Sequence, residues 1–284
     1  MWEYLKQHPQ IAMPDDFKYK EPSFFSLHYR FRLKASDYLN LFAGAEGKMA
    51  IGEASHAYLS SPESAELIHD IYPDAKIIII LRNPVDRAFS LYQWMFREGY
   101  EWLFPFEKAL AAEEERLNDK QFEYQNPQYY YNYLYYYSGL YSEQILRYLT
   151  RFPKEQMRIL LFEDLKYRPL QIVQELYEFL GVDLNFTPVM EIHNKAQMPL
   201  WGQGQYFLKQ RLPKLLKRYH VPMSLRKWLT QQAVAMNLSL GNFRSLKLNP
   251  ATRRYLLDCY RDDIRKTSQV IGRNLDMWLT LPEK

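Results

Sequence analysis

An arginine and a serine eight residues apart have the chemistry to bind an anion together. The segment LRNPVDRAFSLY, residues 81–92, runs from an apolar stretch through Arg82 and Pro84 to Ser90. A strand that ends before Arg82 would leave this arginine at its carboxyl edge, and Pro84 would begin a helix that carries Ser90. A guanidinium offers a planar fork of donors and serine adds a short neutral donor, so phosphate suits the pair. Two alternatives stay open: Arg82 could pair with Asp86 at the surface, and a serine in a helix is often incidental.

Alternating strands and helices are predicted to position this pair. Two continuous apolar runs, residues 75–81 (AKIIIIL) and 157–162 (MRILLF), are typical of parallel strands covered on both faces. A shorter strand is predicted over 48–54, and helices over 2–7, 62–72, 84–96, 106–117, 142–152, 169–180 and 250–272. The pattern predicts an α/β fold, a three-layer sandwich with a central parallel sheet, in which ligands bind at the carboxyl ends of the strands.

Composition places the chain among globular proteins of one domain, residues 1–284. Hydrophobic residues make up 47% and charged residues 25%, and the net charge of +4 does not demand a nucleic-acid partner. The longest aliphatic run, residues 77–81, is far below the roughly 20 residues that a membrane span needs. The start MWEYLKQHPQ predicts no signal peptide, and the single Cys259 excludes an internal disulfide. We therefore expect a cytoplasmic protein without a membrane span.

RNPVDRAFSLY closely resembles the 3′-phosphate-binding element of sulfotransferases that use 3′-phosphoadenosine 5′-phosphosulfate (PAPS), especially the heparan sulfate and bacterial branch. Four more segments are similar to that family: HPQIAMPDDFKYKEPSFFS, IGEASHAYLSSPESAELIHDIYPDAKIIIILRNP, FPKEQMRILLFEDLKYRP and NPATRRYLLDCYRDDIRKTSQVIGRNLDMWL. The resemblance implies a P-loop NTPase-like sulfotransferase fold in which Arg82 and Ser90 bind the 3′-phosphate of PAPS. It also implies transfer of a sulfuryl group to a hydroxyl or amine of a carbohydrate or small-molecule acceptor, with PAP as product. The six histidines show no metal-ligand spacing, so we expect no metal.

The same resemblance suggests further site residues. Glu21, in KEPSFF, occupies the position of the family's general base, although a surface glutamate paired with a neighbouring lysine is the alternative. His28 and His56 are rival bases; His56 stands where the family usually has proline, and Ala54 where the heparan branch has lysine. Arg244, in GNFRSLKLNP, aligns with a loop that closes over the nucleotide and could add a second cation for the 3′-phosphate.

Family members begin with a strand and a Lys-x-Gly-Thr-Thr-Ser loop that binds the 5′-phosphosulfate at a helix N-terminus. Here the sequence opens MWEYLKQHPQI, which in the family lies in or directly after that helix. We therefore expect the chain as printed to lack this strand and loop and to transfer little sulfate. Met1 is then either an internal methionine of a longer protein or the start of a truncated one.

Two alternative functions, and two interpretations of the tyrosine-rich stretch, remain open at this point. The first is a catalytically silent homologue that binds nucleotide or acts as a scaffold. A P-loop kinase fits less well, because the sequence offers no Walker-type lysine motif. The tyrosine-rich stretch at 129–137 could flank the acceptor cleft or pack between helices.

Overall fold

The computed structural model describes residues 1–15, 20–28, 33–190, 198–240 and 246–281. The chain forms two compact units, each assembled from three segments. The first unit contains Met1–Arg82, Tyr141–Ile192 and Thr267–Arg273; the second contains Asn83–Leu140, His193–Lys266 and Asn274–Lys284. The single domain over 1–284 stays a prediction. Within the described ranges, no helix combines the length and apolar character needed to cross a membrane.

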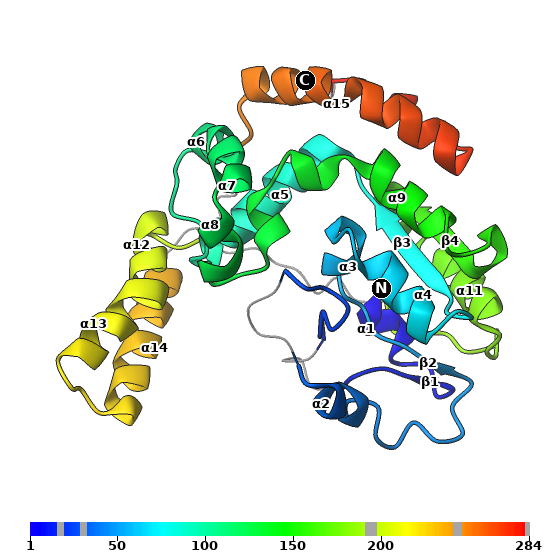
Figure 1. The fold of residues 1–284 in the computed structure, drawn as a ribbon, viewed down its shortest axis with the longest axis horizontal. Coiled ribbons are helices and arrows are strands. Elements are labelled where there is room, and N and C mark those ends of the chain that lie inside the picture. The colour runs from blue at the N-terminus through cyan, green and yellow to red at the C-terminus, as the bar shows by residue number, and fades with distance from the viewer. Residues whose placement is uncertain (16–19, 29–32, 191–197, 241–245, 282–284) are drawn as a thin grey trace. The chain divides into compact units, whose positions relative to one another are not determined.

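The strands of the first unit form two parallel pairs. β1 (Ile11–Ala12) pairs with β2 (Ala50–Ile51), and β3 (Ile77–Leu81) pairs with β4 (Met157–Leu161). β3 and β4 run side by side (Figure 1), with Leu81 opposite Leu161, so both strands end at the same edge. The predicted α/β class with parallel strands is confirmed. The strand predicted over 48–54 shrinks to the two residues of β2.

The helices of the first unit carry the apolar faces that cover these strands. They are α1 (Trp2–Leu5), α2 (Ala35–Asn40), α3 (Ala57–Ser60), α4 (Ser64–Ile71), α9 (Tyr141–Leu149), α10 (Phe162–Tyr167) and α11 (Pro169–Leu180), with the 3₁₀ turn η4 (Lys154–Gln156). In the core, side chains of α11 pack with Leu5, Ile11 and Leu160. The sequence predicts a strand covered on both faces. Ile80 of β3 is 36% exposed, so that cover is incomplete.

The second unit is helical. Its elements are α5 (Pro84–Arg97), α6 (Phe106–Ala111), α7 (Glu113–Asn118), α8 (Lys120–Gln125), η2 (Tyr130–Tyr133), η3 (Tyr137–Gly139), α12 (Gly202–Tyr206), the π-helical η5 (Phe207–Arg211), α13 (Leu212–Arg218), α14 (Met223–Ser239) and η6 (Asp276–Trp278). α15 (Pro250–Ile271) begins here, and its last residues belong to the first unit. The single helix predicted over 106–117 is wrong, because the chain forms α6 and α7 there. The helices between residues 202 and 239 were not predicted.

The start of α5 follows from its sequence. The Asn83 side chain accepts hydrogen bonds from the backbone N–H groups of Val85 (3.0 Å) and Asp86 (3.3 Å), and Pro84 occupies the first helical position. An asparagine cap satisfies donors that a helix end leaves unpaired, and proline has no N–H to lose there. The helix therefore begins at the predicted residue and fixes the direction in which the following side chains point.

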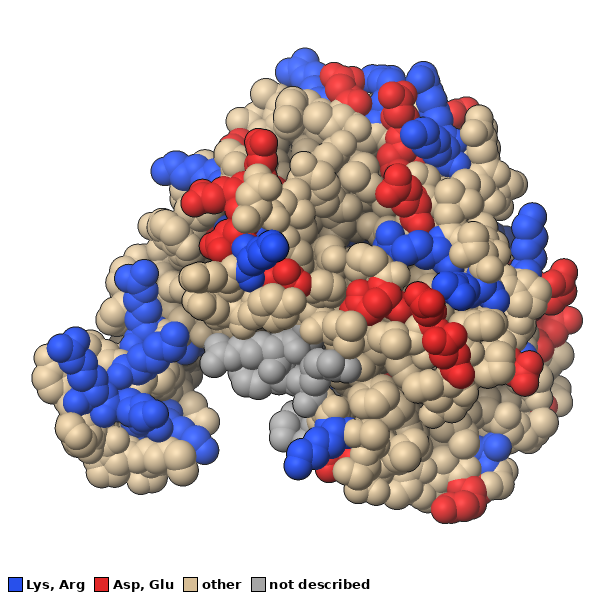
Figure 2. Space-filling view, in the orientation of Figure 1, with Lys and Arg blue, Asp and Glu red and all other residues tan. Residues whose placement is uncertain are grey.

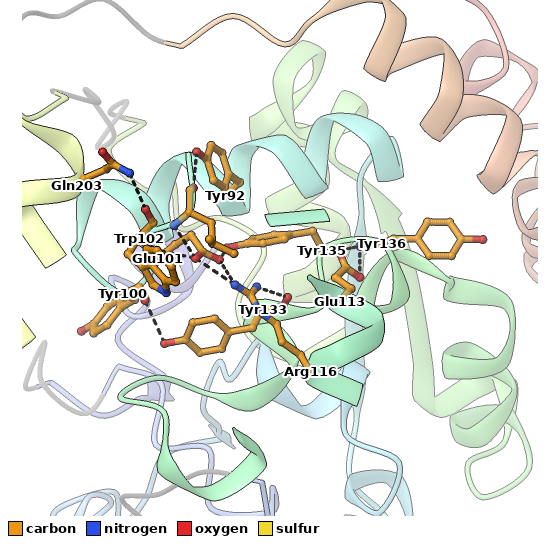
Figure 3. Close-up of polar contacts among 11 residues, drawn as sticks. Tyr92, Tyr100, Glu101, Trp102, Glu113, Arg116, Tyr133, Tyr135, Tyr136 and Gln203 are labelled. Carbon is orange, nitrogen blue, oxygen red and sulfur yellow. Dashed lines mark hydrogen bonds and ion pairs between the residues drawn. The ribbon is translucent and has the colours of Figure 1, made fainter. Parts of the chain in front are cut away.

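A buried ion pair organises the tyrosine-rich part of the second unit (Figure 3). Nη2 of Arg116 donates to both carboxylate oxygens of Glu101, at 2.8 and 3.1 Å, and both side chains are almost completely buried. The Tyr135 hydroxyl donates to the same carboxylate at 2.9 Å, and Nη1 of Arg116 donates to the Tyr133 carbonyl at 2.9 Å. Tyr129, Tyr130, Tyr133 and Tyr135 are buried. Packing between helices therefore accounts for most of this stretch.

Glu113 is a second buried carboxyl group in this cluster. Its side chain is 3% exposed and accepts hydrogen bonds from the backbone N–H groups of Tyr136 and Tyr137. Burial raises the pKa of Glu113 to about 7, although the two N–H donors and the charge of Arg116 oppose that rise. Glu113 is the first residue of α7, directly after the break that separates α7 from α6.

The raised pKa of Glu113 gives the stability a predictable pH dependence. Between about pH 4.5 and 7 the folded state holds a proton that the unfolded state releases, so the free energy of unfolding should fall as pH rises through this window, by about 3 kcal/mol. Glu113→Gln cannot ionise and keeps an acceptor oxygen. Urea denaturation at several pH values should show this variant more stable than wild type above pH 7, with the difference vanishing near pH 4.5. Parallel pH profiles for the two proteins would contradict the assignment.

Candidate functional site

Arg82 lies at the carboxyl edge of the β3–β4 pair. Its guanidinium carbon lies 4.9 Å from the ring centroid of Phe162, the residue that follows β4, and its backbone carbonyl accepts a hydrogen bond from the Tyr141 hydroxyl at 3.0 Å. A guanidinium that stacks on an aromatic ring is held in place while its N–H groups stay available to an anion. The structure therefore positions Arg82 where the sequence predicted an anion-binding arginine.

The surface ion pair considered for Arg82 does not form. Asp86 accepts a hydrogen bond from Nη2 of Arg253 at 2.7 Å, within the second unit. In the described part of the chain, no carboxylate lies within ion-pair distance of Arg82. A half-buried guanidinium without a protein counter-charge is a ready partner for a ligand anion.

Ser90 is half-buried on α5, in the second unit, whereas Arg82 closes a segment of the first. Their convergence on one phosphate therefore stays a prediction. One turn after Ser90, the side-chain amide of Gln93 donates to the Leu246 carbonyl at 2.9 Å. Leu246 directly follows the segment that contains Arg244, which itself lies outside the described residues. This contact of Gln93 was not predicted from the sequence.

Glu21 and His56, predicted as rival bases, form one pair. Nδ1 of His56 lies 2.6 Å from Oε2 of Glu21, and both side chains are partly exposed, at 45% and 42%. Because an ionised carboxylate only accepts, Nδ1 must carry the proton of this hydrogen bond. Desolvation raises the pKa of Glu21, but the charge and hydrogen bond of His56, together with the charge of Lys20, hold that pKa below its ordinary value. Glu21 is therefore an ionised carboxylate at neutral pH.

Glu53 is a neighbouring carboxyl group that the sequence did not single out. It accepts hydrogen bonds from the hydroxyls of Tyr38 (3.1 Å), Tyr58 (2.5 Å) and Ser55. Desolvation raises the pKa of Glu53, the three hydroxyl donors oppose that rise, and the negative charge of Glu21 adds to it. The pKa of Glu21 is thus lowered and that of Glu53 raised. Opposite pKa shifts of neighbouring carboxyl groups are typical of sites that separate acid and base roles.

The backbone holds the segments of this cluster together. The Ser23 N–H donates to the Ser55 hydroxyl oxygen at 2.9 Å, which ties the KEPSFF segment to the segment that carries Glu53 and His56. Ser23 has a φ of 48°, a left-handed conformation that residues other than glycine rarely adopt. His28 is engaged elsewhere, because its Nε2 lies 3.5 Å from Oε2 of Glu63. The structure therefore favours His56 over His28 as the partner of Glu21.

The acidic FEDL turn after β4 has a structural role. Asp164 accepts hydrogen bonds from both terminal nitrogens of Arg273, at 2.5 and 2.8 Å, and from Arg168 at 3.3 Å. The hydrogen bonds from Arg273 are the main cause that lowers the pKa of Asp164, with Arg168 adding to them. This carboxylate is neutralised by two arginines, so we assign it no part in ligand binding.

The hollow found in the first unit lies apart from this site. A hollow of about 450 Å³ lies around Arg158, Lys76 and Phe179, and Arg158 stands near the amino end of β4, away from the edge that carries Arg82. No group of three or more histidine, cysteine or acidic side chains suited to a metal occurs among the described residues.

Comparisons with known proteins identify the family of this chain. A crystal structure of a sulfotransferase from Alicyclobacillus acidocaldarius is similar over 98% of this chain and 92% of its own, with a TM-score of 0.70 and 31% sequence identity. Sulfotransferases have the P-loop-like α/β fold, and this chain shares that fold class. The family model described as "Sulfotransferase domain" matches residues 20–199. The chain belongs to the sulfotransferase family.

Curated relatives are more distant. Membrane-associated sulfotransferase kil1 of Dictyostelium discoideum is 25% identical over 250 residues, covering 63% of this chain and 52% of its own. Bifunctional heparan sulfate N-deacetylase/N-sulfotransferase 2 of Homo sapiens is 27% identical over 214 residues, covering 71% of this chain and 22% of its own. Carbohydrate sulfotransferase 15 of Mus musculus is 25% identical, covering 64% and 41%. The chain thus spans about half or less of the length of these relatives.

Proposed function

We propose that this protein transfers a sulfuryl group from PAPS to a hydroxyl or amine of a carbohydrate or small-molecule acceptor in the cytoplasm. The observation that carries the proposal is the guanidinium of Arg82, which stacks on Phe162 at the carboxyl edge of β3 and has no carboxylate counter-charge among the described residues. Membership of the sulfotransferase family and the heparan sulfate and carbohydrate relatives support the reaction class and the kind of acceptor.

Arg82 and Ser90 fit the 3′-phosphate of the donor, because one supplies a charged fork of N–H groups and the other a half-buried hydroxyl on α5. PAPS, when bound, supplies the sulfuryl group and a PAP leaving group. Gln93 holds the Leu246 carbonyl by a hydrogen bond. Arg244, which lies outside the described residues, is our candidate for a second cation at this phosphate.

Glu21 acts as the general base in this proposal. It takes the proton of the acceptor while the acceptor oxygen or nitrogen bonds to sulfur and the sulfur–oxygen bond to PAP breaks. The proton that leaves the acceptor thus ends on Glu21. His56 donates to Oε2 at 2.6 Å and thereby orients the carboxylate.

Transfer from radiolabelled PAPS to N-desulfated heparin, a monosaccharide and a phenol tests the reaction class. Labelled sulfate on any of them supports it, and robust labelling would contradict the expectation that this sequence by itself transfers little sulfate. Binding isolates the donor site. We expect Arg82→Ala to weaken PAP binding by roughly ten- to a hundredfold in calorimetric titration, because a charge-assisted hydrogen-bond pair is lost.

Arg158→Ala is the matched control. Arg158 also lies over an aromatic ring, 4.3 Å from the Phe179 centroid, but near the other end of β4. This variant should bind PAP as wild type does. Equal PAP affinities for wild type and Arg82→Ala would overturn the assignment of the 3′-phosphate site.

A further inference from the structure

The tip of the α13–α14 hairpin, residues 214–228, combines positive charge with exposed apolar side chains. α13 and α14 pack against each other, and their connection lies at the end of the hairpin away from α12 (Figure 1). Five cations occur in the tip: Lys214, Lys217, Arg218, Arg226 and Lys227. Five large apolar residues of the same tip are exposed: Leu215 (42%), Tyr219 (72%), Met223 (61%), Leu225 (47%) and Trp228 (56%).

The charge of this region is one-sided. The sequence contains no acidic residue between Glu191 and Asp258. Figure 2 shows blue side chains gathered over α13 and α14 with no red among them. Further back, Lys209 pairs with Glu98 at 2.9 Å, whereas none of the five tip cations pairs with a carboxylate in the described part of the chain. Such an uncompensated field attracts a negatively charged surface.

The outward face of α14 is also unusual. Leu225, Trp228 and Met236 recur at helical spacing and are each exposed, although a surface helix ordinarily turns polar residues outward. No charged residue follows Lys227 in this helix. Exposed apolar side chains are unfavourable in water, so this face is suited to an apolar environment. The neighbouring cations are suited to a negatively charged one.

We propose that the hairpin tip docks on a membrane surface that contains anionic phospholipids. The headgroups would neutralise the five cations while Tyr219, Met223 and Trp228 enter the boundary between headgroups and acyl chains. A sulfated polysaccharide would satisfy the cations but leave the apolar side chains in water. A second copy of this chain would cover the apolar side chains but oppose two sets of like charges. The inference holds independently of the proposed sulfuryl transfer.

Co-sedimentation of the whole chain with lipid vesicles tests the proposal. We expect binding to vesicles of phosphatidylcholine with phosphatidylserine, and none to phosphatidylcholine alone. Lys217→Gln/Arg218→Gln should lower the partition coefficient by roughly 25-fold, about fivefold for each cation. Tyr219→Ser should lower it as well, and this loss should persist in high salt.

Matched controls lie elsewhere on the surface. Lys120→Gln/Arg254→Gln removes the same charges, and Tyr167→Ser replaces a tyrosine that is 75% exposed; both variants should bind vesicles as wild type does. Three results would overturn the proposal. They are no binding to anionic vesicles, wild-type binding by the tip variants, or heparin retention or self-association that depends on the tip without vesicle binding.

Discussion

Arg116→Met is expected to lower the free energy of unfolding by about 3–5 kcal/mol, because it leaves the Glu101 carboxylate buried without its cation. Glu101 is 0% exposed and Arg116 only 6%, so water cannot replace the lost guanidinium without opening the core. The Tyr135 hydroxyl and the backbone N–H groups of Trp102 and Leu103 would remain as donors to the carboxylate, but neutral donors do not balance a buried charge. Urea denaturation followed by tryptophan fluorescence measures the change.

Two further variants separate the buried charge from the loss of a side chain. Arg261→Met removes an arginine from an ion pair with Asp258 whose side chains are 40% and 69% exposed, and it should cost less than about 1 kcal/mol. Glu101→Gln/Arg116→Met removes both charges and should recover part of the stability lost by Arg116→Met alone. If Arg116→Met were no more destabilising than Arg261→Met, the buried pair would not be what holds this cluster together.

Glu21→Gln is expected to slow sulfuryl transfer by roughly a hundred- to ten-thousandfold, because the amide cannot accept the proton of the acceptor. His56→Ala should slow it less, since the carboxylate remains but is no longer oriented. The same substitution should raise the pKa of Glu21, because the desolvation that favours the protonated form is then no longer opposed by His56. The carboxyl carbon resonance of Glu21 followed against pH by NMR reports this shift without any turnover.

Glu66→Gln is the control for this pair. Glu66 forms an exposed ion pair with Arg151 in the same unit, so its substitution should leave transfer unchanged. A larger loss with His56→Ala than with Glu21→Gln would make His56 the base and Glu21 its orienting partner. An unchanged rate in Glu21→Gln would remove the pair from the mechanism.

Local signals made the best predictions. Pro84 predicted the start of α5, because the first position of a helix needs no N–H donor. Pro169 and Gly181 predicted the two ends of α11. Gly181 has a φ of 78°, the left-handed conformation that favours glycine after a helix. The apolar runs gave β3 and β4 because continuous β-branched stretches suit parallel strands. The arginine of the predicted anion site consequently lies at a strand's carboxyl edge, as expected.

Features that depend on distant contacts were not predictable. Glu21 and His56 are 35 residues apart, and only the fold shows that two rival bases share one hydrogen bond. The tyrosines at 129–137 have their roles set by buried carboxylates of other segments. The α12–α14 region escaped prediction because α14 is apolar on its outward face as well, so the usual helical periodicity is blurred.

The most direct measurement compares PAP with AMP, which lacks the 3′-phosphate, as ligands of wild type, Arg82→Ala and Arg158→Ala. We expect wild type and Arg158→Ala to bind PAP roughly ten- to a hundredfold more tightly than AMP, since the 3′-phosphate is the group that we propose Arg82 binds. In Arg82→Ala that preference should fall close to parity. Wild type that binds PAP and AMP equally, or an Arg82→Ala variant that keeps the full preference, would contradict the central claim.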